Sequence, residues 1–235
     1  MKNRSRRLPL VALLFLAAAP ADALTHEVVV GDPGLYGQGE NGFPFSTLPG
    51  YYGYPSTRYQ QVFASSAFSG TFNIQELVFY ASSNADAPIL PGTLEIFLSV
   101  TDRGVNEISF RPFDDNLGAS TRFFAALSGG FSLTGPELVI GGSPFLYDPA
   151  QGNLLLDIRF TGVPLGHAGP FFAALSPASV IGGTAMPFSR WHDFGIGFDD
   201  QGLVTGFRTY VPEPATFMLV GLGLAGLWMA RRRSD

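Results

Sequence analysis

Two stretches of this chain alternate apolar and polar side chains with a period of two residues. The apolar positions are Leu94, Ile96, Leu98 and Val100 in the first stretch and Leu154, Leu156, Ile158 and Phe160 in the second. Because successive side chains of a β-strand point to opposite faces, this spacing predicts two strands that each bury one face. Charged residues such as Glu95, Asp157 and Arg159 fall on the other face, a pattern typical of antiparallel sheets with one solvated side.

Shorter apolar runs separated by turn-forming residues predict further strands. The candidates are residues 27–30, 60–64, 72–79, 123–127, 137–140, 171–175, 194–198 and 203–210. Turn signals such as residues 90–92 and 114–116 lie between them, and Gly141-Gly142-Ser143 is interpreted as another turn. Many short strands at this spacing predict an all-β fold, a two-sheet antiparallel β-sandwich with either jelly-roll or immunoglobulin-like topology.

One candidate strand changes phase along its length. Phe72 and Ile74 alternate with polar residues, and the apolar pattern then resumes at Leu77 and Phe79. An extra residue in an antiparallel pair produces such a shift in phase. The sequence therefore predicts a β-bulge near residues 75–76.

The first 23 residues have the three parts of a secretory signal peptide. Basic residues within positions 2–7 precede an apolar stretch at 8–19, and Ala21 and Ala23 provide a small-x-small cleavage site. The mature chain is therefore predicted to begin at Leu24. An apolar stretch of this length is short for a transmembrane helix, which favours cleavage over anchoring.

Residues 211–235 have a different three-part order. A Val-Pro-Glu-Pro-Ala box at 211–215 comes first, an uncharged apolar segment at 216–230 follows, and an arginine cluster at 231–233 comes near the end. The prolines favour an extended box, and arginines stay on the cytoplasmic side of a membrane. As a helix, the apolar segment is about 22 Å long at ~1.5 Å per residue, which is short for a hydrocarbon core of roughly 30 Å. We therefore expect a single, temporary transmembrane helix, with the domain between the two ends outside the cytoplasm.

This tail resembles the PEP-CTERM sorting domain. The residues that carry the resemblance are Pro212, Glu213 and Pro214 in the box, the apolar segment, and Arg231, Arg232 and Arg233. The resemblance covers only the C-terminal tail. It implies that an exosortase, a membrane-embedded processing enzyme, recognises the tail and removes or exchanges it near the box. It also implies transient anchoring in the inner membrane and a final location at the cell surface or in an exopolysaccharide matrix.

Composition limits the partners of the part between the two ends. Residues 24–210 carry seven arginines, no lysine and sixteen acidic residues. Nucleic-acid binding is not expected, because phosphate backbones would be repelled. The absence of cysteine excludes thiol catalysis, cysteine-based metal sites and disulfides. Residues 24–58, rich in Gly, Pro and Tyr, are predicted to form either a binding arm or a loop-rich cover, and residues 59–210 the sandwich domain.

The sequence contains no recognisable catalytic motif. No Gly-x-Ser-x-Gly elbow, His-Glu-x-x-His motif or phosphate-binding glycine loop occurs, and the three histidines are too far apart for a local metal motif. Enzymatic activity and a required cofactor are therefore not expected. The acidic turns at residues 114–116 and 199–202 offer oxygen atoms that calcium accepts, although such residues more often bond to their own backbone.

These observations predict an exported envelope or matrix protein with a structural or adhesive role and no catalysis. The alternative is a carbohydrate-binding module for the host's polysaccharide, whose aromatic rings would stack on sugars. The candidate glycan contacts are Trp191, Tyr51, Tyr52 and Tyr54. A third hypothesis, a matrix glycan hydrolase, requires two carboxylates facing each other across a cleft.

Overall fold

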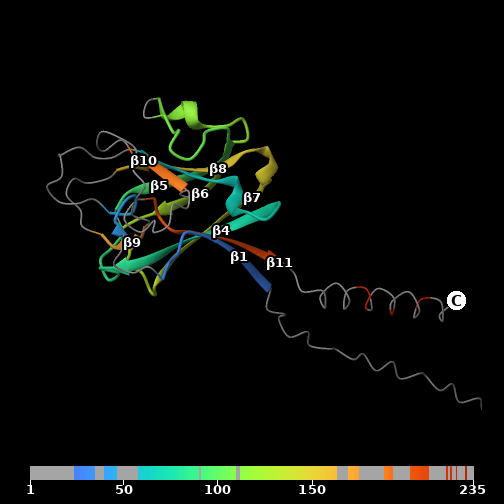
Figure 1. Ribbon diagram of the computed structural model, residues 1–235. Coiled ribbons are helices and arrows are strands. Elements are labelled where there is room, and N and C mark those ends of the chain that lie inside the picture. Colours follow the sequence, from blue (N-terminus) through green and yellow to red (C-terminus); the bar gives the residue numbers. More distant parts are fainter. Residues whose placement is uncertain are drawn as a thin grey trace, which may run out of the picture. The chain divides into compact units, whose positions relative to one another are not determined.

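The computed structural model divides into two compact units: Thr25–Tyr210, and the two ends of the chain, Met1–Leu24 with Val211–Asp235. The structure describes residues 24–34, 40–46, 58–89, 91–109, 112–162, 169–174, 188–192 and 202–211, together with residues 221, 223, 226 and 231. Two β-sheets make up the first unit (Figure 1).

The larger sheet has six strands in the order β1–β11–β4–β9–β2, with β7 paired to β4 outside this path. Its strands are β1 (Leu24–Val30), β2 (Glu40–Asn41), β4 (Phe72–Ser83), β7 (Glu137–Tyr147), β9 (Phe171–Ala173) and β11 (Thr205–Val211). The smaller sheet has the order β10–β3–β8–β5–β6. Its strands are β3 (Arg58–Phe63), β5 (Thr93–Thr101), β6 (Arg122–Ser128), β8 (Asn153–Thr161) and β10 (Phe188–His192).

Three short 3₁₀ segments lie in the connections: η1 (Ser65–Ala67), η2 (Phe113–Asn116) and η3 (Pro149–Gln151). The described part of Thr25–Tyr210 otherwise consists of strands and loops, so the predicted all-β fold with two antiparallel sheets in a sandwich-like arrangement is confirmed.

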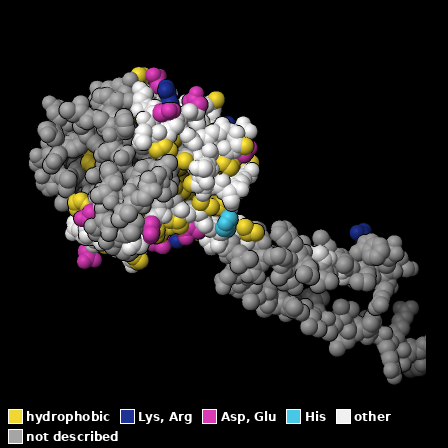
Figure 2. Space-filling view, in the orientation of Figure 1, with side chains coloured by type: hydrophobic (Ala, Val, Ile, Leu, Met, Phe, Trp, Pro, Cys, Tyr) yellow, Lys and Arg dark blue, Asp and Glu magenta, His cyan; other side chains and the backbone are white. Residues whose placement is uncertain are grey.

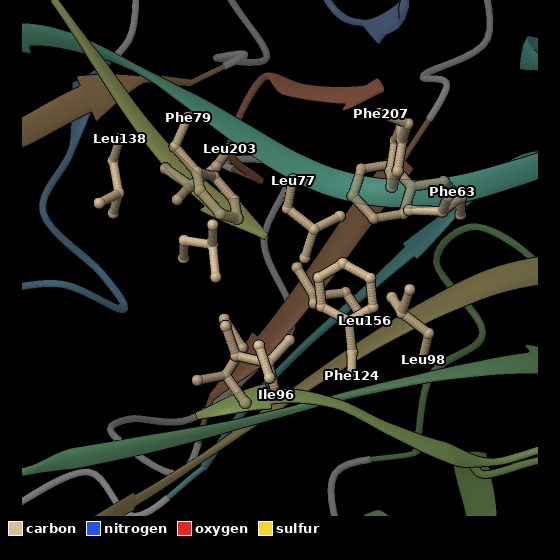
Figure 3. Close-up of a cluster of buried hydrophobic side chains, with 14 of the residues drawn as sticks. Phe63, Leu77, Phe79, Ile96, Leu98, Phe124, Leu138, Leu156, Leu203 and Phe207 are labelled. Atoms are coloured by element: carbon tan, nitrogen blue, oxygen red, sulfur yellow. The ribbon is translucent and has the colours of Figure 1, made fainter. Parts of the chain in front are cut away.

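The hydrophobic core lies between the two sheets (Figure 3). The alternating apolar residues predicted for β5 and β8 are buried, with Val100 only partly so. The opposite sheet contributes Leu77, Phe79 and Phe207, and the Phe207 ring meets the edge of Phe63 at a centroid distance of 5.0 Å. Because burying a side chain of this size contributes about 1.5–3 kcal/mol, this core is the main source of stability.

The irregularity predicted near residues 75–76 is confirmed as a register shift, although the extra residues lie in β7 and not in β4. The register with β7 shifts between Ile74 and Glu76, which pair with Phe145 and Gly141. β7 therefore has three residues, 142–144, opposite a single residue of β4. As a result Phe72 and Ile74 before the bulge, and Leu77 and Phe79 after it, all reach the same core.

The interpretation of Gly141-Gly142-Ser143 as a turn is wrong, because β7 continues through these residues to Tyr147. Glycine has a packing reason here. A Cβ atom built on Gly142 would lie 2.5 Å from the Phe124 ring and 2.6 Å from the Phe124 carbonyl oxygen of β6. The missing side chain lets β7 approach β6 at the side of the sandwich.

Residues before position 59 also enter the sandwich. β1 and β2 belong to the six-stranded sheet. Phe45 is fully buried, and its ring lies 4.8 Å from that of Phe79 and 5.0 Å from that of Phe172. The predicted strand at 194–198 lies outside the described residues, whereas β10, at Phe188–His192, was not predicted.

Gly118 marks a close approach between the loop after η2 and β5. Its N–H donates to Ser99 Oγ at 2.8 Å, and a Cβ atom there would lie 1.6 Å from the Val100 carbonyl oxygen. We expect Gly118→Ala to lower the free energy of unfolding by about 2 kcal/mol, because the backbone must move.

Chemical denaturation of the mature protein measures this effect. Gly70→Ala is the matched control, since a Cβ atom at Gly70 would have no heavy atom within 4 Å, and its effect should stay within about 0.5 kcal/mol. Equal destabilisation by the two substitutions would contradict the steric explanation.

Candidate functional site

Two strand ends of the six-stranded sheet coincide with the predicted ends of the mature chain. β1 begins at Leu24, directly after the predicted cleavage site, and β11 ends at Val211, the first residue of the Val-Pro-Glu-Pro-Ala box. β1 and β11 are hydrogen-bonded neighbours, with β1 at the edge of the sheet. The sorting tail therefore follows the last strand of the domain without a spacer.

A polar cluster ties this pair of strands to the rest of the sheet. Arg208 of β11 contacts Glu27 of β1, with Nε 3.2 Å from Oε1, and donates from Nη2 to Glu137 Oε2 of β7 at 2.9 Å. The Tyr80 hydroxyl of β4 donates to Glu27 Oε1 at 2.7 Å. One arginine thus links strands from both sides of β4.

The electrostatics of this cluster favour the observed charges. Burial opposes the positive charge of Arg208, but its hydrogen bond to Glu137 and the charges of Glu27 and Glu137 outweigh burial, so the Arg208 pKa is raised. Burial raises the pKa of the Tyr80 hydroxyl, and its bond to Glu27 raises it further. Tyr80 therefore stays a neutral donor at physiological pH.

The last residues before the box are also fixed to β4. Gln75 Oε1 accepts from the Tyr210 backbone N–H at 2.7 Å and from the Thr209 hydroxyl at 3.2 Å. The Tyr210 hydroxyl donates to Glu76. The ordered strand therefore extends up to the sorting signal, where the exposed fraction of Val211 reaches 47 %.

A family model described as the PEP-CTERM protein-sorting motif matches residues 211–233. The chain is a PEP-CTERM domain-containing protein. The motif implies that this PEP-CTERM protein is exported, is held transiently in the membrane through its C-terminal region, and is processed by an exosortase. The match begins at Val211, the residue where β11 ends.

Most residues of the predicted signals lie outside the described part of the PEP-CTERM protein. These are Ala21, Ala23, Pro212, Glu213, Pro214, Arg232 and Arg233. Four positions of the tail, Gly221, Gly223, Gly226 and Arg231, are described, and each has helical backbone and is exposed. The predicted transmembrane helix at 216–230 otherwise lies outside the described residues. Within the described residues, no helix is both long and apolar enough to cross a membrane.

No curated protein matches the chain. Among solved structures, two from infectious bursal disease virus are similar: the structure of the Gt strain, with 13 % identity and a TM-score of 0.26, and T=1 particles of the D431N mutant VP2 protein, with 14 % identity and a TM-score of 0.26. The alignments cover 83 % and 88 % of this chain but only 43 % and 46 % of the viral chains. The chain thus spans less than half the length of either one.

A second polar cluster, which the sequence analysis missed, is centred on Asp157 of β8. Its carboxylate accepts from Arg58 Nε at 2.7 Å, from Arg58 Nη2 at 2.9 Å and from Arg159 Nε at 3.0 Å. Gln60 Nε2 adds a fourth bond at 3.1 Å. Only 1 % of the Asp157 side chain is exposed, so a buried carboxylate is balanced by two guanidinium groups.

The loop between β5 and β6 covers this cluster on the outer face of the five-stranded sheet. Asp114 of η2 accepts from Arg58 Nη1 at 2.7 Å, and the Arg58 guanidinium lies 5.3 Å from the centre of the Phe113 ring. Figure 2 shows acidic and basic side chains next to each other at the top of the visible described surface, and further acidic side chains at the lower left. The ion pair between Arg58 and Asp114 therefore holds the loop on the sheet.

The Asp157 cluster keeps its groups ionised. Burial opposes the charge of Arg58, but hydrogen bonds and charges of Asp157 and Asp114 outweigh it and raise the Arg58 pKa. The hydrogen bond and charge of Arg58 hold the Asp114 pKa below its usual value. Both effects favour the ion pair over its neutral forms.

The acidic turn at 114–116 has a structural role in this cover. Asn116 Nδ2 donates to Gln60 Oε1 at 2.8 Å, and Asn116 Oδ1 accepts from the Ser109 N–H at 2.7 Å. Among the described residues, no three His, Cys, Asp or Glu side chains gather into a metal-binding group. The other candidate calcium turn, at 199–202, lies outside the described residues except for Gly202.

The predicted glycan contacts are divided between described and undescribed parts. Tyr51, Tyr52 and Tyr54 lie outside the described residues. Trp191 belongs to β10, where it is the register partner of Gln60. The sequence placed Trp191 in no strand, because residues 188–192 lack a period-two pattern. Trp191 pairs with Gln60 in the strand register, and Gln60 pairs with Asp157. These pairings between distant strands cannot be read from the sequence near Trp191.

Proposed function

We propose that this protein is an exported component of the cell envelope or of an exopolysaccharide matrix, with a structural or adhesive role and no catalysis. The observation that carries the proposal is the sorting motif at 211–233, which starts where the last strand of the sandwich ends. Such an arrangement favours a domain that folds outside the cytoplasm and is then released or re-attached as a unit.

The described charged groups support a role in binding and scaffolding. In both polar clusters, arginines and carboxylates bind one another and join neighbouring strands. The first cluster includes Glu27 and Arg208, and the second includes Arg58 and Asp157. Ion pairs between neighbouring strands stabilise a rigid surface. A domain held together by two sheets and paired charges is suited to a matrix.

We expect replacement of Pro212, Glu213 and Pro214 by alanine to abolish processing, so that the exported chain keeps its tail. Intact mass spectrometry on protein from the native host, combined with fractionation into membrane, surface and matrix, measures the outcome. Asp32→Ala with Pro33→Ala, in an exposed turn far from the box in sequence, is the control and should be processed normally. A wild-type chain that keeps its tail and stays in the membrane fraction would overturn the proposal.

A second candidate function is a carbohydrate-binding module. It is favoured by the pairing of β5 and β6, which places the rings of Phe97 and the exposed Phe123 next to each other on the five-stranded sheet. Aromatic residues in a row on a sheet can stack on successive sugars of a chain.

A further inference from the structure

Strand register aligns one row of residues across the whole five-stranded sheet. Trp191 pairs with Gln60, Gln60 with Asp157, Asp157 with Phe97, and Phe97 with Phe123. Directly paired residues of antiparallel strands lie on the same face of a sheet. Since Asp157 alternates with the core residues Leu156 and Ile158, this row belongs to the outer face.

The β6 end of the row presents an aromatic surface to solvent. Phe123 is 48 % exposed, and its ring meets the Phe97 ring edge-to-face at 5.7 Å and 77°. The Arg159 guanidinium lies 4.2 Å from the centre of the Phe97 ring. An exposed ring and a cation therefore lie on two sides of Phe97.

Arg159 is held in a fixed orientation. Its Nε atom donates to Asp157, which Arg58 and Gln60 hold from the other side. The side chain of Arg159 is nevertheless 36 % exposed. An arginine whose fork is oriented before binding loses less entropy when it receives a carboxylate, and its planar geometry matches one.

The strands of the five-stranded sheet are more basic than those of the six-stranded sheet, although Glu95 is the register partner of Arg159 and Asp114 lies on the same outer face. The strands of the five-stranded sheet contain four arginines and two acidic residues: Arg58, Arg122, Arg159 and Arg190, against Glu95 and Asp157. The strands of the six-stranded sheet contain Arg208 against Glu27, Glu40, Glu76 and Glu137. Because charges are screened over about 8 Å at physiological salt, a ligand responds mainly to the sheet that it touches.

We propose that the outer face of the five-stranded sheet, around Phe123, Phe97 and Arg159, binds an acidic polysaccharide. A sugar ring stacks on Phe123, and a carboxylate of the polymer is bound by Arg159. One exposed ring beside one cation matches the size of a sugar unit, whereas a stable protein interface needs about 800 Å² on each partner. This site rests on the proposed function, because the matrix location brings the domain to such polymers.

Affinity electrophoresis and calorimetry of the mature protein test this site, with polygalacturonate as the acidic probe and dextran as the neutral one. We expect Phe123→Ala and Arg159→Gln each to weaken polygalacturonate binding at least tenfold, and binding of the wild type to weaken as salt increases. Leu146→Ala is the matched control, because Leu146 is 70 % exposed on the other sheet, and it should change the affinity less than twofold. Thermal unfolding of each variant shows that the fold is kept.

Three results would overturn the site: no binding of polygalacturonate by the wild type, equal affinity for dextran, or equal weakening by Phe123→Ala and Leu146→Ala. Fractionation of the native host separates this failure from failure of the proposed function. Suppose that the wild type does not bind polygalacturonate, while the Phe123→Ala variant is still processed and found in the matrix. The proposed function would then stand, and the proposed site would be rejected.

Discussion

Asp157→Ala is expected to lower the free energy of unfolding of the mature protein by about 3–5 kcal/mol. The substitution removes the acceptor of two bonds from Arg58, one from Arg159 and one from Gln60. Only 15 % of the Arg58 side chain is exposed, so its charge would be left mostly buried with Asp114 as the remaining carboxylate partner in the cluster. For a domain of this size the melting temperature should fall by roughly 10 °C.

Asp114→Ala provides the control, because Asp114 binds the same arginine from the solvent side. The Asp114 side chain is 72 % exposed, against 1 % for Asp157. Exposed ion pairs contribute about 0–1 kcal/mol, so the control should change stability little. Urea denaturation followed by circular dichroism compares the two. Equal effects would show that burial of the carboxylate does not decide its contribution.

Gln61→Leu is expected to cost about 3 kcal/mol, although leucine has a similar volume and leaves no large cavity. Gln61 is fully buried in β3, and its amide binds Leu203 in the segment that leads into β11. Its Oε1 atom accepts from the Leu203 N–H at 2.9 Å and from the Tyr59 hydroxyl, and its Nε2 atom donates to the Leu203 carbonyl at 2.8 Å. With leucine, two buried donors, the Leu203 N–H and the Tyr59 hydroxyl, would lose this acceptor. The Leu203 carbonyl would still accept a hydrogen bond from the Thr205 hydroxyl.

Gln75→Leu is the matched control for this prediction. Gln75 also accepts from a backbone N–H, that of Tyr210, but this hydrogen bond is exposed. Water can replace the lost acceptor there, so the free energy of unfolding should change by less than about 1 kcal/mol. Guanidinium denaturation measures both variants. A similar loss for the two glutamines would contradict the role of Gln61 as a buried link between β3 and the segment before β11.

The parts of the fold that follow a local rule could be predicted from the sequence. Alternation in β5 and β8 reflects burial of one face, and the phase change in β4 reflects the bulge, so both appear in the order of residues alone. The sorting motif could also be predicted, because proline, apolar and arginine blocks are read along a single segment. The family match at 211–233 confirms it.

The parts that depend on pairing between distant strands could not be predicted. Asp157 is one charged residue in an alternating strand, and nothing near it in sequence indicates that Arg58, 99 positions away, donates to it. Gly142 of β7 packs against Phe124 of another strand, a contact that the sequence near Gly142 does not indicate. Local composition therefore favoured a turn at a place where packing requires a strand.

The order β1–β11–β4 also sets the time at which the domain can be completed during export. A chain that leaves the cytoplasm from its N-terminus delivers β1 first and β11 last, and β1 has β11 as its neighbour in the sheet. β1 therefore cannot pair with β11 until nearly the whole domain has crossed the membrane. The apolar segment of the tail follows only a few residues later in the chain. Since the motif implies transient anchoring in the membrane through the C-terminal region, we expect closure of the sheet to coincide nearly with that anchoring, so that an exosortase acts on the tail of a domain that has just become complete.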